Sequence, residues 1–300
     1  MPRIRRPSIL LGVVPTATGA SGPGGGLSRM FSRRAAPPGQ VYGTPGQGSS
    51  TAIGVVTSVV LIALWFLVTN MGWIKPLFLP TPQAVWGKFV LAATEGVANS
   101  TLLEHTTASL MRVFGAFLLA CVTAIPVGIL MGSNRIMRGI FDPPVEFYRP
   151  LPPLSYLPLM IIWFGIGELS KILLIFLAIF APMAISARAG VRSAGIEQIH
   201  AAYAMGASRF QILTRVVLPA ATPEILTGMR IGIGFGWTTL VAAEMIAANR
   251  GLGFMVLNAA QYLQSDTVIM GIVVIGFFAF AFDMLMRYLE RVLVPWKGKV

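Results

Sequence analysis

The stretch ILTGMRIGIGFGWTTLVAAEMIAA, from Ile225 to Ala248, is the clearest indicator of the fold class of this chain. Apart from Arg230 and Glu244, it contains only apolar and small polar residues. A helix that crosses a bilayer needs about 20 mostly apolar residues, because the hydrocarbon core is about 30 Å thick and a helix rises about 1.5 Å per residue. The stretch meets this requirement, so we predict that it forms a membrane-spanning helix.

The rest of the chain has a similar character. Hydrophobic residues make up 55% of its 300 residues and charged residues only 11%, and the mean hydropathy is +0.74. Soluble globular proteins contain about 25% charged residues. The sequence therefore predicts an all-α membrane protein with about six transmembrane helices. Besides Ile225–Ala248, the predicted spans are Ala52–Trp73, Arg112–Met131, Gly139–Gly165, Lys171–Ala187 and Thr267–Met286.

The third span in chain order, Gly139–Gly165, is the least regular. Proline lacks the backbone N–H and disfavours helix in the residue before it, so this span is not expected to be one continuous helix. Irregular backbone at membrane depth is tolerated only where protein or a water-filled cavity covers it. The break therefore indicates either a ligand path or a structural kink without a ligand. The prolines are Pro143, Pro144, Pro150, Pro152, Pro153 and Pro158.

The basic residues set the expected orientation. They gather in residues 1–50, after the second span, after the fourth span and at the C-terminus, which all lie on one side if there are six spans. The positive-inside rule makes that side the cytoplasm, so both termini are predicted to be cytoplasmic. This topology explains the formal net charge of +12. The basic residues are also expected to attract anionic membrane lipid. A nucleic-acid partner is not expected, because the aromatic residues lie inside the apolar runs.

Two domains are expected. Residues 1–50 are rich in Gly, Pro, Ser and Arg and contain no acidic residue. Such a segment buries too little apolar surface to offset its ordering entropy, so we predict a disordered basic cytoplasmic tail. Residues 51–300 are expected to form the transmembrane domain.

Enzyme chemistry is not expected. The only Gly-Lys pairs are Gly87-Lys88 and Gly298-Lys299, and neither is followed by the Ser or Thr of a phosphate-binding loop. Cys121 is the only cysteine, and no Ser-His-Asp or metal-ligand pattern is present. We therefore predict no catalytic residue, no cofactor and no metal. Any ATP-driven activity requires a separate ATPase subunit.

The segment HAAYAMGASRFQILTRVVLP, from His200 to Pro219, is polar and basic between apolar runs. Gly206 divides it into two short predicted helices, because glycine permits the backbone change that a sharp turn needs. Pro219 is predicted to end the second helix. An apolar stripe and a polar face on these helices fit either docking on a partner or resting on lipid, and the residues alone leave both open. The predicted stripe consists of Tyr203, Phe210, Leu213 and Val217.

This segment resembles the cytoplasmic loop of ABC importer permeases, which has the pattern Glu-Ala-Ala, three residues, Gly, and later Leu-Pro. His200 stands at the Glu position, which is a departure from the pattern. The resemblance implies a type I permease fold and a coupling loop, residues 188–222, that contacts an ATP-hydrolysing subunit. The residues that it assigns to coupling are His200, Ala201, Ala202, Gly206, Ala207, Leu218 and Pro219.

Two further stretches narrow the resemblance. PLPPLSYLPLMIIWFGIGELSKI (Pro150–Ile172) resembles the nitrate, sulfonate and taurine branch of these permeases, and Ile225–Val256 with PWKGKV (Pro295–Val300) is most similar to its taurine members. The resemblance implies a multi-pass protein of the bacterial inner membrane that works as a permease homodimer with a periplasmic substrate-binding protein. The expected substrate is taurine or a similar sulfonate. The alternatives are a permease for nitrate or another small anion, and a stand-alone secondary transporter.

Ionisable residues inside the membrane are candidates for the translocation path, because burial of a charge is costly. Arg149 either attracts a sulfonate anion, or pairs with Glu146 at i,i+3 or anchors at the lipid headgroups, and the latter two roles are favoured. Glu244 would repel an anion, which favours a structural or gating hydrogen bond. Arg112, at the start of its span, is expected to extend to the membrane interface.

Two local pairings are also predicted. Asp283 is expected to pair with Arg287, which lies four residues later. Gly232 and Gly236 form a Gly-x-x-x-Gly motif, which predicts a tight contact with a neighbouring helix of the same chain or of a second copy.

Overall fold

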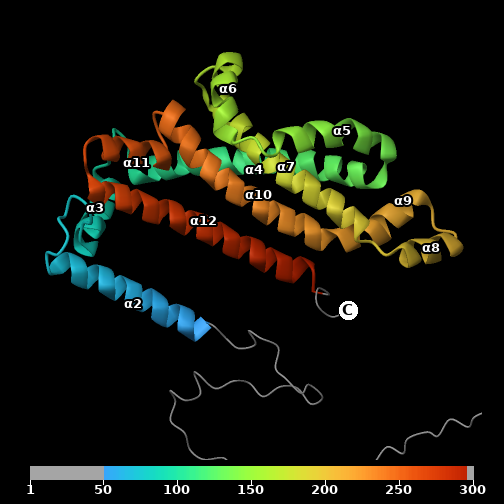
Figure 1. Ribbon diagram of the computed structural model, residues 1–300, viewed down its shortest axis with the longest axis horizontal. Helices are drawn as coiled ribbons and strands as arrows, with labels where there is room; N and C mark the ends of the chain where they lie inside the picture. The colour runs from blue at the N-terminus through green and yellow to red at the C-terminus, as the bar shows by residue number, and fades with distance from the viewer. Residues whose placement is uncertain (1–50, 296–300) are drawn as a thin grey trace, which may run out of the picture. The chain divides into compact units, whose positions relative to one another are not determined.

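The computed structural model describes residues 51–295, and their regular structure is helical (Figure 1). The predicted tail, residues 1–50, and residues 296–300 lie outside the described part. Five of the described helices are long and apolar enough to cross a membrane. They are α2 (Thr51–Asn70), α4 (Leu102–Ser133), α7 (Glu168–Arg192), α10 (Leu218–Ala247) and α12 (Ser265–Leu293).

The chain divides into two compact units, Met1–Leu64 and Trp65–Val300. The described part of the first unit is the larger portion of α2, whose apolar side chains, such as those of Val59 and Leu61, are exposed. A helix that is apolar on all sides suits a lipid environment. The second unit contains the other helices and all of the predicted site residues.

Glycine residues allow α4, α7 and α10 to pack closely. A Cβ atom added at Gly236 of α10 would lie 2.8 Å from Ile179 Cδ1, and one at Gly232 would lie 3.1 Å from Ile179 Cγ2. Gly128 of α4 lies in the same way against Ala184 of α7. Small residues let helix backbones approach one another in lipid. The prediction of a tight contact at Gly232 and Gly236 is confirmed, and the neighbour is α7 of the same chain.

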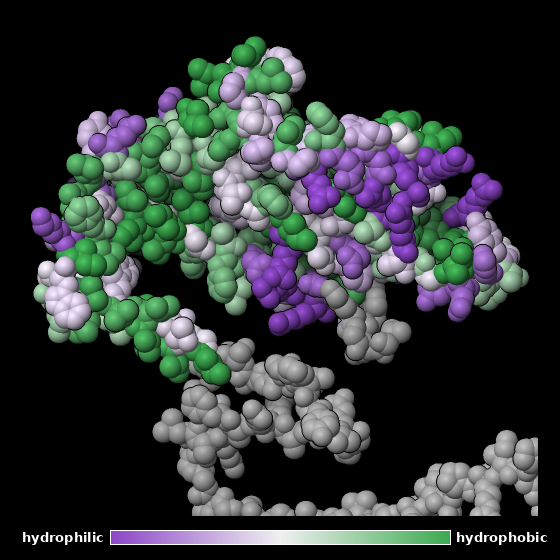
Figure 2. All heavy atoms as spheres, in the orientation of Figure 1, coloured by the Kyte–Doolittle hydropathy of each residue, from purple (hydrophilic) through white to green (hydrophobic). Residues whose placement is uncertain are grey.

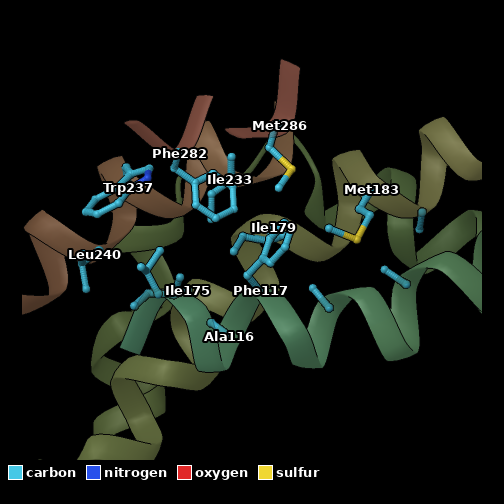
Figure 3. Close-up of a cluster of buried hydrophobic side chains, with 14 residues drawn as sticks. Ala116, Phe117, Ile175, Ile179, Met183, Ile233, Trp237, Leu240, Phe282 and Met286 are labelled. Carbon is cyan, nitrogen blue, oxygen red and sulfur yellow. The ribbon is translucent and has the colours of Figure 1, made fainter. Parts of the chain in front are cut away.

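Larger apolar side chains fill the space between these helices and α12. Phe117 of α4, Ile179 of α7 and Ile233 of α10 are buried, and Phe282 of α12 packs edge-on against Phe117 with 5.3 Å between the ring centroids. Figure 3 shows these side chains converging from the four helices, with Trp237 beside them. This cluster is the main apolar core of the second unit.

Helices α4 and α7 run in the same direction. Arg112, near the start of α4, hydrogen-bonds to Glu168 at the start of α7. Gly132, near the end of α4, lies against Val191 near the end of α7. The chain between the two helices must therefore return along the bundle from one end to the other.

That return is the predicted third span, and it is not a single helix. It consists of α5 (Arg135–Tyr148), the short 3-10 helix η1 (Pro153–Tyr156) and α6 (Leu157–Phe164). The interruption falls at Arg149–Pro152, where closely spaced prolines remove backbone donors. Pro143 and Pro144 instead lie inside α5. The expected break is confirmed, and the expectation of one span over Gly139–Gly165 is corrected to α5 followed, after the interruption, by η1 and α6.

Short helices occupy the two ends of the second unit. At the end where α4 begins lie α3 (Pro82–Thr94) and α11 (Leu252–Gln261), which share a buried apolar cluster with α12. At the opposite end lie α8 (Ile196–Ala204) and α9 (Arg209–Ile212), as Figure 1 shows. The predicted coupling segment thus lies at one end of the bundle, and the loop from α10 to α11 lies at the other.

Candidate functional site

The turn between α8 and α9 has the geometry that the sequence predicted. Gly206 has φ +82°, a left-handed conformation that favours glycine. The Ala207 N–H donates to the Ala202 carbonyl at 3.0 Å, and the Gly206 N–H donates to the Tyr203 carbonyl at 2.9 Å. These two bonds form a Schellman motif, which ends α8 and satisfies carbonyls that would otherwise lack a donor. Gly206 therefore forms the turn between two short helices that the sequence predicts.

The second helix of the segment His200–Pro219 is α9, and it continues further along the chain than the sequence predicted. Ser208 caps α9 by accepting from the Gln211 N–H at 3.3 Å, and the chain then passes through the π-helical turn η2 (Leu213–Val217) directly into α10. Pro219 lies in the first turn of α10, so the prediction that it ends the helix is wrong. In a regular α-helix the proline ring would clash with the Arg215 carbonyl, and the wider π turn lies where that clash would occur.

The α8–α9 tip exposes large apolar side chains. Met205 is 81% exposed and Phe210 is 73% exposed, and Tyr203 is half exposed. The buried side chains are instead Ala202 and Ile212, which pack in a small cluster that includes Val191, Val217 and Ala221. Tyr203 and Phe210 are exposed whereas Val217 is buried, so the residues of the predicted stripe do not all lie on one face.

The predicted coupling residues are spread over this element. His200, Ala201 and Gly206 are exposed, Ala202 is buried, and Ala207, Leu218 and Pro219 are half-buried. The exposed members lie on α8 and at the turn to α9, near the exposed Met205 and Phe210 in the chain. These exposed residues are suited to contact with another protein or with a membrane surface.

Arg149 lies at the interruption between α5 and η1 and is 57% exposed. Its Nη1 lies 3.5 Å from Glu146 Oε2, so the predicted i,i+3 pair is present at long distance. Glu146 also accepts from Nη2 of Arg188 on α7 at 3.2 Å, and Arg188 Nη1 donates to Asp142. Two arginines and two carboxylates therefore link α5 to α7 beside the broken segment.

A cavity of about 400 Å³ lies beside the interruption. Tyr148, Arg149, Tyr156 and the prolines between them line one side, and α7 and α10 line the other. The Tyr148 hydroxyl is buried and has no hydrogen-bond partner among residues 51–295. The lining of the cavity therefore combines an apolar wall with one arginine and two tyrosines. The residues from the two long helices are Leu177, Ala178, Ala181, Pro182, Ile185, Ser186, Ile231 and Phe235.

Glu244 is fully buried and completely engaged. Its carboxylate accepts from the Ser109 hydroxyl at 2.7 Å, from Arg112 Nη1 at 2.6 Å and from the Gly253 N–H at 2.9 Å. Buried charges persist in proteins when they are paired and hydrogen-bonded in this way. The favoured prediction for Glu244, a structural or gating hydrogen bond, is consistent with this geometry.

Arg112 is the centre of the same network. It is only 4% exposed, donates to both carboxylate oxygens of Glu168 at 2.5 and 2.8 Å, and reaches the Arg250 carbonyl at 2.7 Å. Lys171 adds a second cation at 2.9 Å from Glu168. The expectation that Arg112 extends to the membrane interface is wrong, because two carboxylates hold it inside the bundle.

The network also fixes the loop from α10 to α11. The Gly251 N–H donates to His105 Nδ1 at 3.1 Å, and His105 Nε2 lies 2.9 Å from the Val97 carbonyl, which requires the proton on Nε2. Gly251 has φ +136°, and a Cβ atom there would collide with the Glu244 carboxylate. We call Ser109, Arg112, Glu168, Glu244 and the Arg250–Gly253 loop the buried ion network.

Asp283 has more partners than predicted. Its Oδ2 accepts from Arg287 Nε at 2.8 Å, which confirms the predicted pair. Its Oδ1 accepts from Arg230 Nε on α10 at 2.5 Å, a contact that sequence reasoning missed. Arg230 and Asp283 are 53 residues apart, and no local spacing rule connects them. Within residues 51–295, no group of three or more His, Cys, Asp or Glu side chains is arranged to hold a metal ion.

Comparison with known proteins places the chain among membrane transport components. Residues 124–294 match the family model of the binding-protein-dependent transport system inner membrane component. The chain is 54% identical over 249 residues to the taurine transport system permease protein TauC of Escherichia coli, covering 83% of this chain and 90% of TauC. It is 34% identical over 245 residues to the putative aliphatic sulfonates transport permease protein SsuC of Bacillus subtilis, covering 82% and 87%.

A solved structure has the same fold. An inward-facing structure of the MetNI methionine ABC transporter matches with a TM-score of 0.56 and 19% identity, over 64% of this chain and 95% of that one. Together with the long apolar helices, these matches make the chain a multi-pass inner-membrane protein with the type I importer permease fold. The chain belongs to the family of binding-protein-dependent transport system inner membrane components, the permease subunits of ABC importers.

Proposed function

We propose that this chain is the permease through which an ABC importer moves taurine or a similar small sulfonate across the inner membrane. The 54% identity to TauC over 90% of the length of that protein carries the proposal. The likeness to SsuC, whose name refers to aliphatic sulfonates, supports the same class of substrate. The chain performs no chemistry on the substrate.

A permease for another small anion is the second candidate. The chain is 34% identical to the bicarbonate transport system permease protein CmpB of Synechococcus elongatus, but over only 65% of this chain and 71% of CmpB. This weaker and shorter match makes a planar inorganic anion the less favoured substrate. A stand-alone secondary transporter is disfavoured, because the family acts with a substrate-binding protein.

Energy for transport comes in this proposal from a separate ATP-hydrolysing subunit, which docks on the α8–α9 tip. Exposed apolar side chains at Met205 and Phe210 give that surface the aromatic and methionine content typical of protein interfaces. His200 stands where related permeases carry glutamate, so the contact there depends on an imidazole rather than a carboxylate. The other proposed coupling residues are Ala201, Ala202, Gly206, Ala207, Leu218 and Pro219.

The translocation path is proposed to pass the cavity at the interruption, where Arg149 offers positive charge to a sulfonate. Glu244 contributes to the path indirectly, because the buried ion network holds α4, α7 and α10 in position at the end of the bundle where α4 begins. A permease homodimer would place the path between two copies of the chain, both surrounded by membrane lipid. A periplasmic binding protein would deliver the substrate to this path. ATP binding would then switch the path between its two openings by rigid-body gating.

Uptake by reconstituted vesicles tests the proposal. The chain is inserted into vesicles with its ATPase subunit, the binding protein is added outside, and ATP is enclosed on the ATPase side. We expect accumulation of labelled taurine that requires both ATP and the binding protein. Accumulation of labelled nitrate with no taurine uptake would favour the second candidate. Uptake driven by an ion gradient without ATP would refute the importer mechanism.

A further inference from the structure

A second cavity of about 400 Å³ lies at the C-terminal end of α12. Its lining is charged, with Arg230 from α10 and with Arg287, Glu290 and Arg291 from the last turns of α12. Figure 2 shows a group of hydrophilic side chains at this end of α12, with a mostly hydrophobic surface to its left. Nothing in the proposed transport cycle uses this cavity.

Asp283 orients two of the arginines toward the cavity. It accepts from Nε of Arg230 at 2.5 Å and from Nε of Arg287 at 2.8 Å. Both contacts with Asp283 use Nε, so they leave the terminal Nη1 and Nη2 groups of the two arginines unengaged by this carboxylate. Two guanidinium groups from different helices therefore border one cavity, each held at Nε by the same carboxylate.

The charge and the position of the cavity indicate the chemical class of its ligand. Three arginines outnumber the two carboxylates of Asp283 and Glu290, so the site carries excess positive charge. The basic loops identify this end of α12 as the cytoplasmic side, where lipid phosphates lie. A guanidinium fork matches two phosphate oxygens, and basic pockets between transmembrane helices on this side bind anionic lipid headgroups.

We propose that the cavity bordered by Arg230, Arg287 and Arg291 binds the phosphodiester headgroup of one anionic phospholipid of the cytoplasmic leaflet. The lipid then joins the end of α12 to α10, because Arg230 and Arg287 lie on different helices. This inference does not depend on the identity of the transported substrate.

Native mass spectrometry of the detergent-solubilised chain tests the proposal, with phosphatidylglycerol and phosphatidylcholine as the two probes. We expect one phosphatidylglycerol to remain bound at concentrations where no phosphatidylcholine does. Arg287→Gln should weaken phosphatidylglycerol binding about fivefold. Arg135→Gln is the matched control, because it removes an exposed arginine on the same membrane side and should change nothing. Equal binding of the two lipids, or equal behaviour of the two variants, would overturn the proposal.

Two further variants separate a built site from diffuse charge attraction. Arg287→Lys keeps the charge but removes the fork, and it should lose most of what Arg287→Gln loses. Asp283→Asn adds net positive charge but releases both arginines, so binding should weaken. Wild-type affinity of Arg287→Lys for phosphatidylglycerol would contradict the proposed site. Tighter binding of phosphatidylglycerol by Asp283→Asn would also contradict it. If Asp283→Asn does not fold, the result for Arg287→Lys decides.

Inorganic phosphate distinguishes the two sources of the same chemistry. A large molar excess of phosphate should not displace phosphatidylglycerol, because the acyl chains add membrane-side binding that a free ion lacks. Displacement of the lipid by phosphate would overturn the lipid assignment in favour of a soluble anion.

Discussion

The two ends of the helix bundle are stabilised in opposite ways. At the end where α4 begins, the buried ion network joins three helices and a loop, and its central side chains Ser109, Arg112 and Glu244 are withdrawn from solvent. At the other end, α8 and α9 depend on a Schellman turn, a serine cap and a small apolar cluster. The first end has satisfied its polar groups internally, whereas the second exposes Met205 and Phe210. One end is therefore held by internal polar contacts, whereas the other presents exposed apolar side chains.

The largest expected effect comes from the centre of the buried ion network. Arg112→Met would leave Glu244 buried with no cation, and removal of one partner of a buried ion pair costs about 3–5 kcal/mol of unfolding free energy. We expect a strong decrease in thermal stability in detergent. Arg149→Met is the matched control, since exposed pairs contribute about 0–1 kcal/mol. Equal stability of the two variants would show that the network does not hold this end.

The next effect concerns the hinge at the other end. Proline at position 206 requires φ near −65°, whereas Gly206 has φ +82°, so Gly206→Pro should disrupt the turn at a cost of about 3 kcal/mol. ATP-driven taurine uptake should fall more than tenfold, with less effect on the melting temperature than Arg112→Met. Gly206→Asn should retain uptake, because asparagine tolerates the left-handed conformation. Normal uptake by Gly206→Pro would refute the coupling role.

A smaller effect is expected between the two ends, where glycine sets the helix spacing. Gly232→Leu would force a side chain into Ile179, and overpacking of this kind costs about 1–3 kcal/mol. The loss should appear in the thermal stability of the chain itself, whether or not a dimer forms. Gly234→Leu faces open space and should change stability by less than about 0.5 kcal/mol. A loss of dimer at unchanged stability of the chain would contradict packing against α7.

The smallest effect on the isolated chain is expected at the exposed tip. Phe210→Ala removes an aromatic side chain that contacts little within the chain, so thermal stability should stay within about 0.5 kcal/mol. Binding of the ATPase subunit should weaken about tenfold, because buried aromatic residues dominate interface energies. Val292→Ala, an equally apolar exposed site on α12, is the control and should leave ATPase binding unchanged. An unaffected complex in Phe210→Ala would move the docking surface elsewhere.

Local features of this chain were predictable from its sequence. The transmembrane helices follow from apolar length, the interruption after Tyr148 follows from prolines that lack a donor, and the hinge follows from the conformational freedom of Gly206. The family resemblance was equally readable, because its motifs are contiguous. The tip was only partly predictable: the stripe through Tyr203 and Phe210 assumed a regular helix, and the turn at Gly206 changes the faces of the helices on either side of it.

The sequence by itself determined that this is a helical membrane permease with a turn at Gly206 between two short helices, because those properties depend on neighbouring residues. Only the tertiary structure decided how the charges are used. Arg112 and Glu244 are 132 residues apart, and Arg112 and Glu168 are 56 residues apart. The pairing of such distant groups requires that α4 and α7 run parallel and that α10 closes against them. In a low-dielectric interior each buried charge needs a partner, and only the packed helices specify which one it finds.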